Sequence, residues 1–319
     1  MKKYSLKSNE GYSSMKWGLA VGVRQNLDEV LRVSEIAYHG GIDQIWVVDF
    51  PASQLASVAA TMLAKYVPMR LGIGLLSPLL YSPQQMIRMI QSIRDNYDIE
   101  TDIMVGSGDP LWLSRVGLEY SSGLVAVRAV RDEVIEIMEL LKKNELASQL
   151  LLAAQGPKMI SIARLGDGVL LNYSDPTMIQ WAVKQMGTMP EGYVKGVFPP
   201  TALADKTYRL PEYAKNAAAI VALGTSSKVL KRFGLLAELS GPKNDLNEKG
   251  ELTAEIVNSI PEEILSRFIL HCTPDDLNEY VSSLVSMGID LIVFGPPLSS
   301  LEQGVEMLVS AKQKYSEGQ

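Results

Sequence analysis

The sequence predicts an α/β fold of the (β/α)8, or TIM-barrel, type, with a helical insertion before the eighth strand. Three observations lead to this prediction. Eight short apolar runs occur along the chain, and helical sequence follows them. The runs are apolar on both faces, as strands of a parallel sheet covered by helices must be. The 319 residues, 47% of them hydrophobic, suffice for one large barrel domain.

The first four predicted strands are separated by amphipathic stretches with recognisable helix ends. These strands are 16–23, 44–50, 69–76 and 101–108. Asn26 is a good N-cap for the first helix, and Gly40 ends it. Pro51 lies in the first turn of the second helix, and Ser82 caps the third. Met86 and Met89 follow helical spacing in the third helix, which indicates core packing.

The second half of the chain continues the pattern and then departs from it. A helix is predicted around 130–143, and the last four strands are predicted at 149–154, 167–172, 192–200 and 289–297. The stretch from about 203 to 285 is mostly helical and too long for one crossover. We therefore expect residues 1–14 to be a polar extension and 15–319 to be a single domain, with an insertion of several helices at about 203–265.

Composition and charge exclude several classes of function. The net charge is −6 and both signs are interleaved, so no basic stripe indicates a nucleic-acid partner. No apolar run reaches the roughly 18 residues of a membrane span. Cys272 is the only cysteine, and His39 and His271 lack metal-ligand spacing, so we expect neither a disulfide nor a metal site. The start lacks an apolar signal-peptide core, so we expect a cytoplasmic protein whose partner is a small-molecule substrate.

The predicted strand ends are rich in glycine, proline and polar residues. They read Asp49-Phe50-Pro51, Gly72 to Pro78, Gly106 to Pro110, Gln155-Gly156-Pro157, Asn172, and Gly295-Pro296-Pro297. In a TIM barrel, catalysis takes place where the strands end. Glycine at these points lets a ligand approach the backbone closely. The sequence therefore predicts a small-molecule site at the C-terminal mouth of the barrel.

Two of these strand ends allow both a functional and a structural interpretation. Gly156-Pro157 would open a helix whose amides, together with Lys158, attract a phosphate or carboxylate. Equally, the pair only starts a helix and Lys158 is solvated. Asp49 is a candidate acid, base or ligand anchor, but the pattern alone favours capping of the following helix. Asp109, before Pro110, has the same two interpretations.

Several segments together resemble one known family. They are "GGIDQIWVVDF", "RLGIGLLSPLLYSP", "VGSGDPLWLSRVGL", "LLLAAQGPKMISIARLGDGVLLNYSDP" and "TPDDLNEYVSSLVSMGIDLIVFGPP". In order and spacing they resemble the coenzyme F420-dependent methylenetetrahydromethanopterin reductases of the bacterial luciferase-like superfamily. The resemblance covers about 15–309, apart from a weak stretch near 200–265. It implies a (β/α)8 barrel with insertions that binds a flavin or 5-deazaflavin at its mouth, in a homo-oligomer.

The resemblance also implies roles for individual residues. The third strand would carry a bulge with a non-prolyl cis peptide, Gly74-Leu75, behind the cofactor ring. The turn after the fifth strand would hold the phosphate-bearing side chain of the cofactor, with Lys158 as an anion neighbour. The implied cofactor-binding residues are Gly74, Leu75, Ser107, Gly108, Gln155, Gly156, Pro157, Lys158 and Asn172.

Two positions depart from the pattern of that family. The reductases carry Asp-His where this chain has Asp49-Phe50, and a glutamate where it has Ala20. Both missing residues are candidates for proton handling. We expect a coenzyme F420-dependent oxidoreductase that transfers a hydride to or from a small organic substrate, with Asp49 as the catalytic polar group and Phe50 in the substrate pocket. The alternatives are an FMN-dependent monooxygenase and a non-catalytic flavin- or deazaflavin-binding protein.

Overall fold

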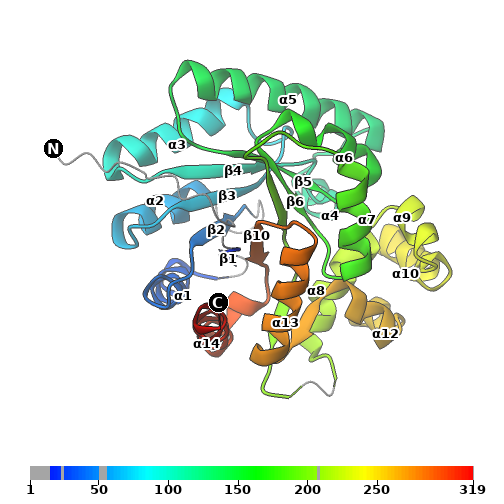
Figure 1. The fold of residues 1–319 in the computed structure, drawn as a ribbon. Helices are drawn as coiled ribbons and strands as arrows, with labels where there is room; N and C mark the ends of the chain where they lie inside the picture. The colour runs from blue at the N-terminus through cyan, green and yellow to red at the C-terminus, as the bar shows by residue number, and fades with distance from the viewer. Residues whose placement is uncertain (1–14, 23–24, 50–55, 207–208, 319) are drawn as a thin grey trace.

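The computed structural model describes residues 15–22, 25–49, 56–206 and 209–318. Eight parallel strands close into a barrel in the order β1-β10-β7-β6-β5-β4-β3-β2 (Figure 1). The strands are β1 (Lys16–Val21), β2 (Gln44–Val48), β3 (Leu71–Leu76), β4 (Thr101–Val105), β5 (Leu150–Ala154), β6 (Gly168–Leu171), β7 (Val194–Val197) and β10 (Leu291–Phe294). The closed parallel barrel confirms the fold class that the sequence predicts.

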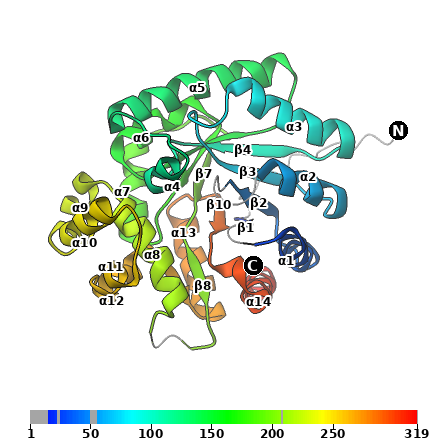
Figure 2. The same ribbon diagram turned by 180° about the vertical axis from the view of Figure 1, so that it is seen from behind.

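Helices surround the barrel in both views (Figures 1 and 2). They are α1 (Leu27–His39), α2 (Ala56–Tyr66), α3 (Pro83–Tyr97), α4 (Pro110–Arg115), α5 (Gly123–Lys143), α6 (Pro157–Ile162), α7 (Pro176–Met186), α13 (Pro274–Ser286) and α14 (Glu302–Glu317). Asn26 and Ser82 cap α1 and α3 with complete capping boxes, as predicted. Helix α5 begins at Gly123, earlier than the predicted 130, because Ser122 caps it.

The region between β7 and α13 contains helices and a small sheet. The sheet consists of two parallel strands, β8 (Thr201–Leu203) and β9 (Leu270–Cys272). The helices between them are α8 (Glu212–Gly224), α9 (Ser227–Arg232), α10 (Leu236–Lys249), α11 (Ala254–Asn258) and α12 (Glu262–Leu265). Three short 3₁₀ turns, η1 (Ala163–Leu165), η2 (Ser266–Phe268) and η3 (Leu298–Ser300), complete the described elements.

The small sheet corrects one sequence prediction. The seventh strand was expected to run from 192 to 200, but β7 ends at Val197 and β8 begins at Thr201. The two prolines between them, Pro199 and Pro200, lack backbone N–H groups, so a continuous ladder cannot pass through. The chain therefore leaves the barrel and pairs with β9, a partner that lies far along the sequence.

An ion pair fastens the inserted region to the outside of the barrel. Arg267, in η2, places Nε 2.6 Å from Oδ2 of Asp175, which also caps α7. The backbone oxygen of Arg267 accepts a hydrogen bond from Ser174 at 3.1 Å, and Tyr280 of α13 donates to the backbone of Ser174 at 2.9 Å. In Figure 2 the helices α8 to α12 accordingly stand together on the side of the barrel that carries α7.

The barrel interior is filled by a small apolar cluster around one tryptophan. The cluster consists of Ala20, Trp46, Met104, Leu151, Leu170, Leu291 and Val293. Trp46 is 1% exposed, and a Cβ on Gly72 would lie only 2.2 Å from its ring. Glycine in the neighbouring strand is therefore required for the indole to fit. The filled interior closes the barrel and leaves its mouth as the surface on which a ligand can rest.

At the N-terminal end of the barrel, aspartates bind backbone N–H groups of adjacent strands. Asp43 accepts from Trp17 at 2.7 Å, Asp102 from Gln149 at 2.8 Å, Asp167 from Leu150 at 2.9 Å and Asp290 from Lys195 at 2.9 Å. These carboxylates satisfy donors that the strand ladders leave open. The acidic residues at this end therefore serve the barrel itself.

Candidate functional site

The predicted site residues meet at the C-terminal ends of neighbouring strands. The backbone N–H of Asp49 donates to the oxygen of Gly74 at 3.0 Å, which joins the ends of β2 and β3. The N–H of Gly106 donates to Leu76 at 3.1 Å, and that of Asn172 donates to Ala154 at 3.1 Å. These bonds extend the barrel by a residue beyond each strand. The structure thereby brings together stretches that are widely separated in the sequence.

Strand β3 has the irregularity that the family resemblance implies. Its register against β4 shifts between Ile73 and Leu76, and the Gly74-Leu75 peptide bond is cis. A Cβ on Gly74 would lie 2.7 Å from the backbone oxygen of Met104, so only glycine fits there. A Cβ on Gly106 would lie 2.5 Å from Leu75 Cδ1. Glycine at both positions therefore lets Leu75 lie across the end of β4.

An apolar floor lies above the filled interior of the barrel. We use this name for Val48, Leu75, Ala153 and Phe198, which are half-buried and pack against the interior cluster. They come from β2, β3, β5 and the residue after β7. A half-buried apolar surface with polar groups at its edges is the usual setting of a small-molecule site. Its side chains can support the face of a flat ring.

One edge of the mouth is formed by the turn after β4. Ser77, which is 1% exposed, donates its hydroxyl to the backbone oxygen of Ser107 at 3.1 Å. Gly108 has a φ of +83°, which favours glycine. Asp109 accepts from the N–H of Leu111 at 2.8 Å and caps α4, and burial raises the pKa of its carboxyl group. Of the two interpretations of Asp109, the structure supports capping.

The turn after β5 is open on the Cβ side of Gly156, whereas the side chain of Gln155 is engaged. The amide of Gln155 donates to Thr225 Oγ1 at 2.7 Å and to the oxygen of Val221 at 3.3 Å, so it is held by the end of α8. Gly156 is the N-cap residue of α6, and as a glycine it has no side chain that could cap the helix. A Cβ on Gly156 would meet only Ser226 Oγ, at 3.8 Å, within 4 Å. Lys158 is exposed.

The insertion contributes residues to this turn that the sequence did not reveal. Thr225 is fully buried, and Lys243 of α10 donates from Nζ to its backbone oxygen at 2.8 Å. Burial lowers the pKa of the Lys243 ammonium group. These residues follow β5 by a long stretch of chain, and no local motif marks them. Only the docking of the insertion places them beside Gln155 and Gly156.

Asp49 is buried at the edge of the apolar floor and has two hydrogen-bond donors among the described residues. It is 6% exposed, and its Oδ1 accepts from the N–H of Ala56, the first residue of α2, at 3.1 Å. This bond agrees with the capping interpretation. The hydroxyl of Tyr81 lies 3.0 Å from each carboxyl oxygen. Burial raises the pKa of Asp49, although both donors oppose the rise.

Tyr81 was missed in the sequence because it belongs to no strand and no helix. It lies in the loop between β3 and α3, immediately before the N-cap Ser82. Burial and the neighbouring negative charge of Asp49 raise the pKa of its phenol. Phe50, the expected wall of the substrate pocket, lies outside the described residues. Ala20, at the position where the family resemblance implies a glutamate, is fully buried in the interior cluster.

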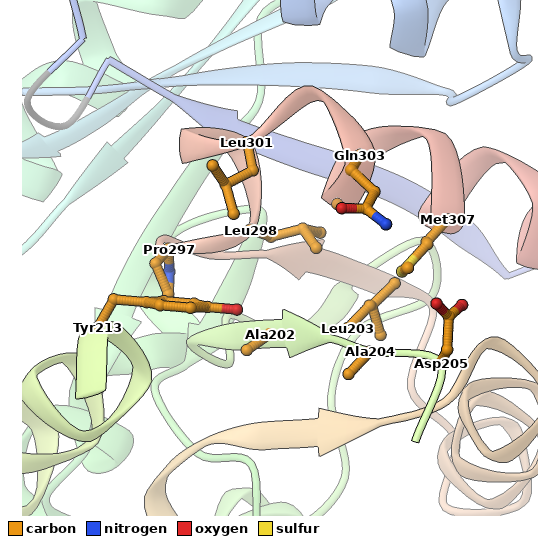
Figure 3. Close-up of a pocket in the computed structure, with 11 residues that line it drawn as sticks. Ala202, Leu203, Ala204, Asp205, Tyr213, Pro297, Leu298, Leu301, Gln303 and Met307 are labelled. Atoms are coloured by element: carbon orange, nitrogen blue, oxygen red, sulfur yellow. The ribbon is translucent and has the colours of Figure 1, made fainter. Parts of the chain in front are cut away.

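A hollow lies outside the barrel between β8, α8 and α14 (Figure 3). It has a volume of about 230 Å³, and Tyr213, Pro297, Leu298, Leu301 and Met307 contribute much of its lining. Asp205 is the only charged residue among those that line it. None of the described residues that line this hollow is cationic, whereas an anionic cofactor favours nearby cations, so the mouth of the barrel is the better candidate.

Membrane-spanning helices and metal-binding clusters are both absent from the described part of the chain. None of its helices is long and apolar enough to cross a membrane. It contains no group of three or more histidine, cysteine or acidic residues placed to hold a metal ion. Cys272 is buried, which raises the pKa of its thiol to about 12, and it cannot act as a ready nucleophile.

Comparison with known proteins identifies relatives along most of the chain. A 5,10-methylenetetrahydromethanopterin reductase from Archaeoglobus fulgidus is 26% identical over 317 residues, which covers 89% of this chain and 94% of the relative. No family model matches the sequence.

Solved structures share the fold. The coenzyme F420-dependent tetrahydromethanopterin reductase from Methanopyrus kandleri superimposes with a TM-score of 0.78 at 17% identity, covering 93% of this chain and 98% of that one. An F420-dependent secondary alcohol dehydrogenase in complex with an F420–acetone adduct gives 0.68 at 14% identity, covering 93% and 98%. The oxygenating constituent of 3,6-diketocamphane monooxygenase from Pseudomonas putida, in complex with FMN, gives 0.58 at 14% identity, covering 92% and 96%.

Proposed function

This chain belongs to the bacterial luciferase-like family and is related to the methylenetetrahydromethanopterin reductases, and we propose that it is a coenzyme F420-dependent oxidoreductase. The proposed reaction is hydride transfer between the deazaflavin ring and a small organic substrate, at a CH–NH or CH–OH group. The observation that carries the proposal is the apolar floor at the mouth of the barrel, with Asp49 at one edge and the Gln155-Gly156 turn near another.

The residues present fit such a cofactor. A flat ring needs an apolar support, and Leu75 and Ala153 offer half-buried surfaces for it. A charged side chain needs an open backbone and nearby cations. Gly156 is open on its Cβ side, and Lys243 and Lys158 belong to the same region of the mouth. In this proposal Ser107, Gly108 and Asn172 complete the site, and the engaged Gln155 side chain fixes the turn.

The protein contributes orientation, exclusion of water and a group that can hold a proton. When bound, coenzyme F420 supplies the hydride chemistry. The apolar floor orients a planar group, because Val48 and Leu75 lie on barrel strands and Phe198 directly follows one, and these strands cannot move independently. Asp49 holds its carboxyl group beside this floor, where it can accept a proton or a hydrogen bond at Oδ1 or Oδ2.

FMN is a second candidate cofactor, because the oxygenating constituent of 3,6-diketocamphane monooxygenase, whose structure superimposes on this chain, is in complex with FMN. Equilibrium titration of the cofactor-free protein with coenzyme F420 and with FMN, followed by fluorescence, separates the candidates. We expect F420 to bind at least about tenfold more tightly, a difference of about 1.4 kcal/mol. Tighter binding of FMN would overturn the proposal. Binding of F420 without turnover on methylenetetrahydropterins or secondary alcohols would leave a cofactor-binding protein.

Replacing Gly156 with aspartate should weaken F420 binding about tenfold or more. The new carboxylate would stand where the proposed site holds the charged side chain, and repulsion between like charges is strong in a partly buried site. Gly156 has a negative φ and space for a Cβ, so the fold should tolerate the change. The measurement is the same fluorescence titration.

A matched variant controls for the added charge. Gly123 is exposed at the start of α5, and a Cβ there meets nothing within 4 Å. Gly123→Asp adds the same carboxylate at a helix start, where it is tolerated, and should leave F420 binding unchanged. If Gly156→Asp and the wild type bind F420 with equal affinity, the charged side chain of the cofactor does not lie at Gly156.

A further inference from the structure

We propose that Tyr81 is a positioning residue of the site, whose hydroxyl group orients the buried Asp49 carboxyl group and stabilises its charged form. The proposal rests on the proposed function only in assigning Asp49 to the site. The relationship between the two side chains is a property of the protein without cofactor.

The geometry of the pair favours an orienting role. Tyr81 Oη lies 3.0 Å from Asp49 Oδ1 and 3.0 Å from Asp49 Oδ2, so the hydroxyl group is equally distant from both carboxyl oxygens. Capping α2 requires one oxygen only, and Oδ1 already accepts from Ala56. The contact of Tyr81 with Oδ2 is therefore additional to capping. It restrains the rotation of the carboxyl group about its last bond.

Tyr81 is itself held in place from two sides. Its backbone N–H donates to the oxygen of Ser77 at 3.1 Å, and Ser82, which follows, caps α3. The side chain of Ser77 donates a hydrogen bond to the backbone oxygen of Ser107, in the turn after β4. The ends of β2, β3 and β4 are thus connected through one loop. A phenol held in this way can fix the side chain that it contacts.

Tyr81 supplies one of the two hydrogen-bond donors that the described residues give to the Asp49 carboxyl group. A carboxylate can accept about four hydrogen bonds, and the described residues supply two donors. Tyr81 is the only titratable side chain among them that contacts it. The group is buried, so each donor matters for keeping the negative charge stable.

Replacing Tyr81 with phenylalanine tests the proposal in the protein without cofactor. The change removes one hydroxyl and keeps the ring. Because the hydroxyl stabilises the carboxylate, its loss should raise the pKa of Asp49, observed as an upward shift of its ¹³C carboxyl titration in NMR. In turnover, the acidic limb of the kcat profile should move to higher pH in the same variant. An unchanged Asp49 titration in Tyr81→Phe would overturn the proposal.

A matched control and a reciprocal variant complete the test. Tyr120→Phe removes a hydroxyl that lies 3.4 Å from Ser77 Oγ, and it should leave the Asp49 titration in place. Should Tyr81→Phe not fold, Asp49→Asn serves instead, because loss of the negative charge should shift the Tyr81 phenol titration to lower pH. No shift there contradicts the pairing. If neither F420 nor FMN binds, the proposed function fails while these titrations remain valid.

Discussion

Replacing Asp49 with asparagine should reduce hydride transfer by a factor on the order of 10² to 10⁴, the usual contribution of a positioned proton-handling group. Asparagine keeps an oxygen that can accept from Ala56 and Tyr81, so the cap of α2 survives. It cannot take up a proton at the pH of the assay. The expected result is a lower kcat with little change in the affinity for F420, measured by steady-state kinetics and fluorescence titration.

The effect of Asp49 on the stability of the fold changes with pH in a direction that its raised pKa determines. Burial raises the pKa of Asp49 in the folded state. The carboxyl group therefore penalises folding as the pH rises from its unfolded-state pKa, about 4, through the folded-state value. Asparagine removes this penalty, so Asp49→Asn should unfold at an equal or higher temperature than the wild type at pH 7. A loss of thermal stability at pH 7 would mean that Asp49 serves the fold.

Asp109 provides the matched control for Asp49. It is also a capping aspartate at a strand end, and burial raises the pKa of its carboxyl group as well. Asp109→Asn should keep the cap of α4 and retain turnover. Equal losses of activity in the two variants would contradict a specific role for Asp49, because they would point to a general disturbance of the barrel mouth.

Replacing Trp46 with alanine should destabilise the protein by about 3–5 kcal/mol, the range for removal of a fully buried aromatic side chain. The indole is 1% exposed and fills the middle of the barrel against Gly18 and Gly72. Neighbouring strands are fixed by their ladders and cannot collapse into the space. Denaturant unfolding followed by circular dichroism gives the free energy of unfolding.

Gly72 provides a partner for a double-mutant cycle. Gly72→Ala alone should cost about 1–3 kcal/mol or more, because its Cβ would lie 2.2 Å from the Trp46 ring. In the Trp46→Ala background the same change should cost much less. Trp112, half-buried beside Arg115, is the control, and Trp112→Ala should cost less than Trp46→Ala. Additive effects of Gly72 and Trp46 would mean that the strands shift to accommodate both.

Local patterns predicted the elements whose causes are local. The capping boxes at Asn26 and Ser82 depend on residues three positions apart, so the sequence displays them directly. Alternating apolar runs and helical stretches predicted eight barrel strands for the same reason. The cis peptide at Gly74-Leu75 and the bulge around it were predicted from the family resemblance and are confirmed. The functional assignments of the site residues remain predictions.

The missed features are those that depend on contacts between distant segments. Strand β8 exists because β9, which follows five helices later, pairs with it, and neither run is long enough to indicate a strand alone. Thr225 and Lys243 reach the turn after β5 only through the docking of the insertion. Tyr81 contacts Asp49 because two βα loops converge at the mouth of the barrel.

The sequence by itself determined the barrel, the caps and the strand ends at which a site is expected, because periodicity, turn residues and glycines act over a few positions. The tertiary structure alone decided the partners of those strand ends. It placed Tyr81 beside the buried Asp49 and bound the Gln155 side chain to the end of α8. It also surrounded Ala20 with the apolar side chains of the barrel interior. Hydrogen bonding and burial depend on distances in space, and closing the barrel sets those distances between segments that the chain keeps far apart.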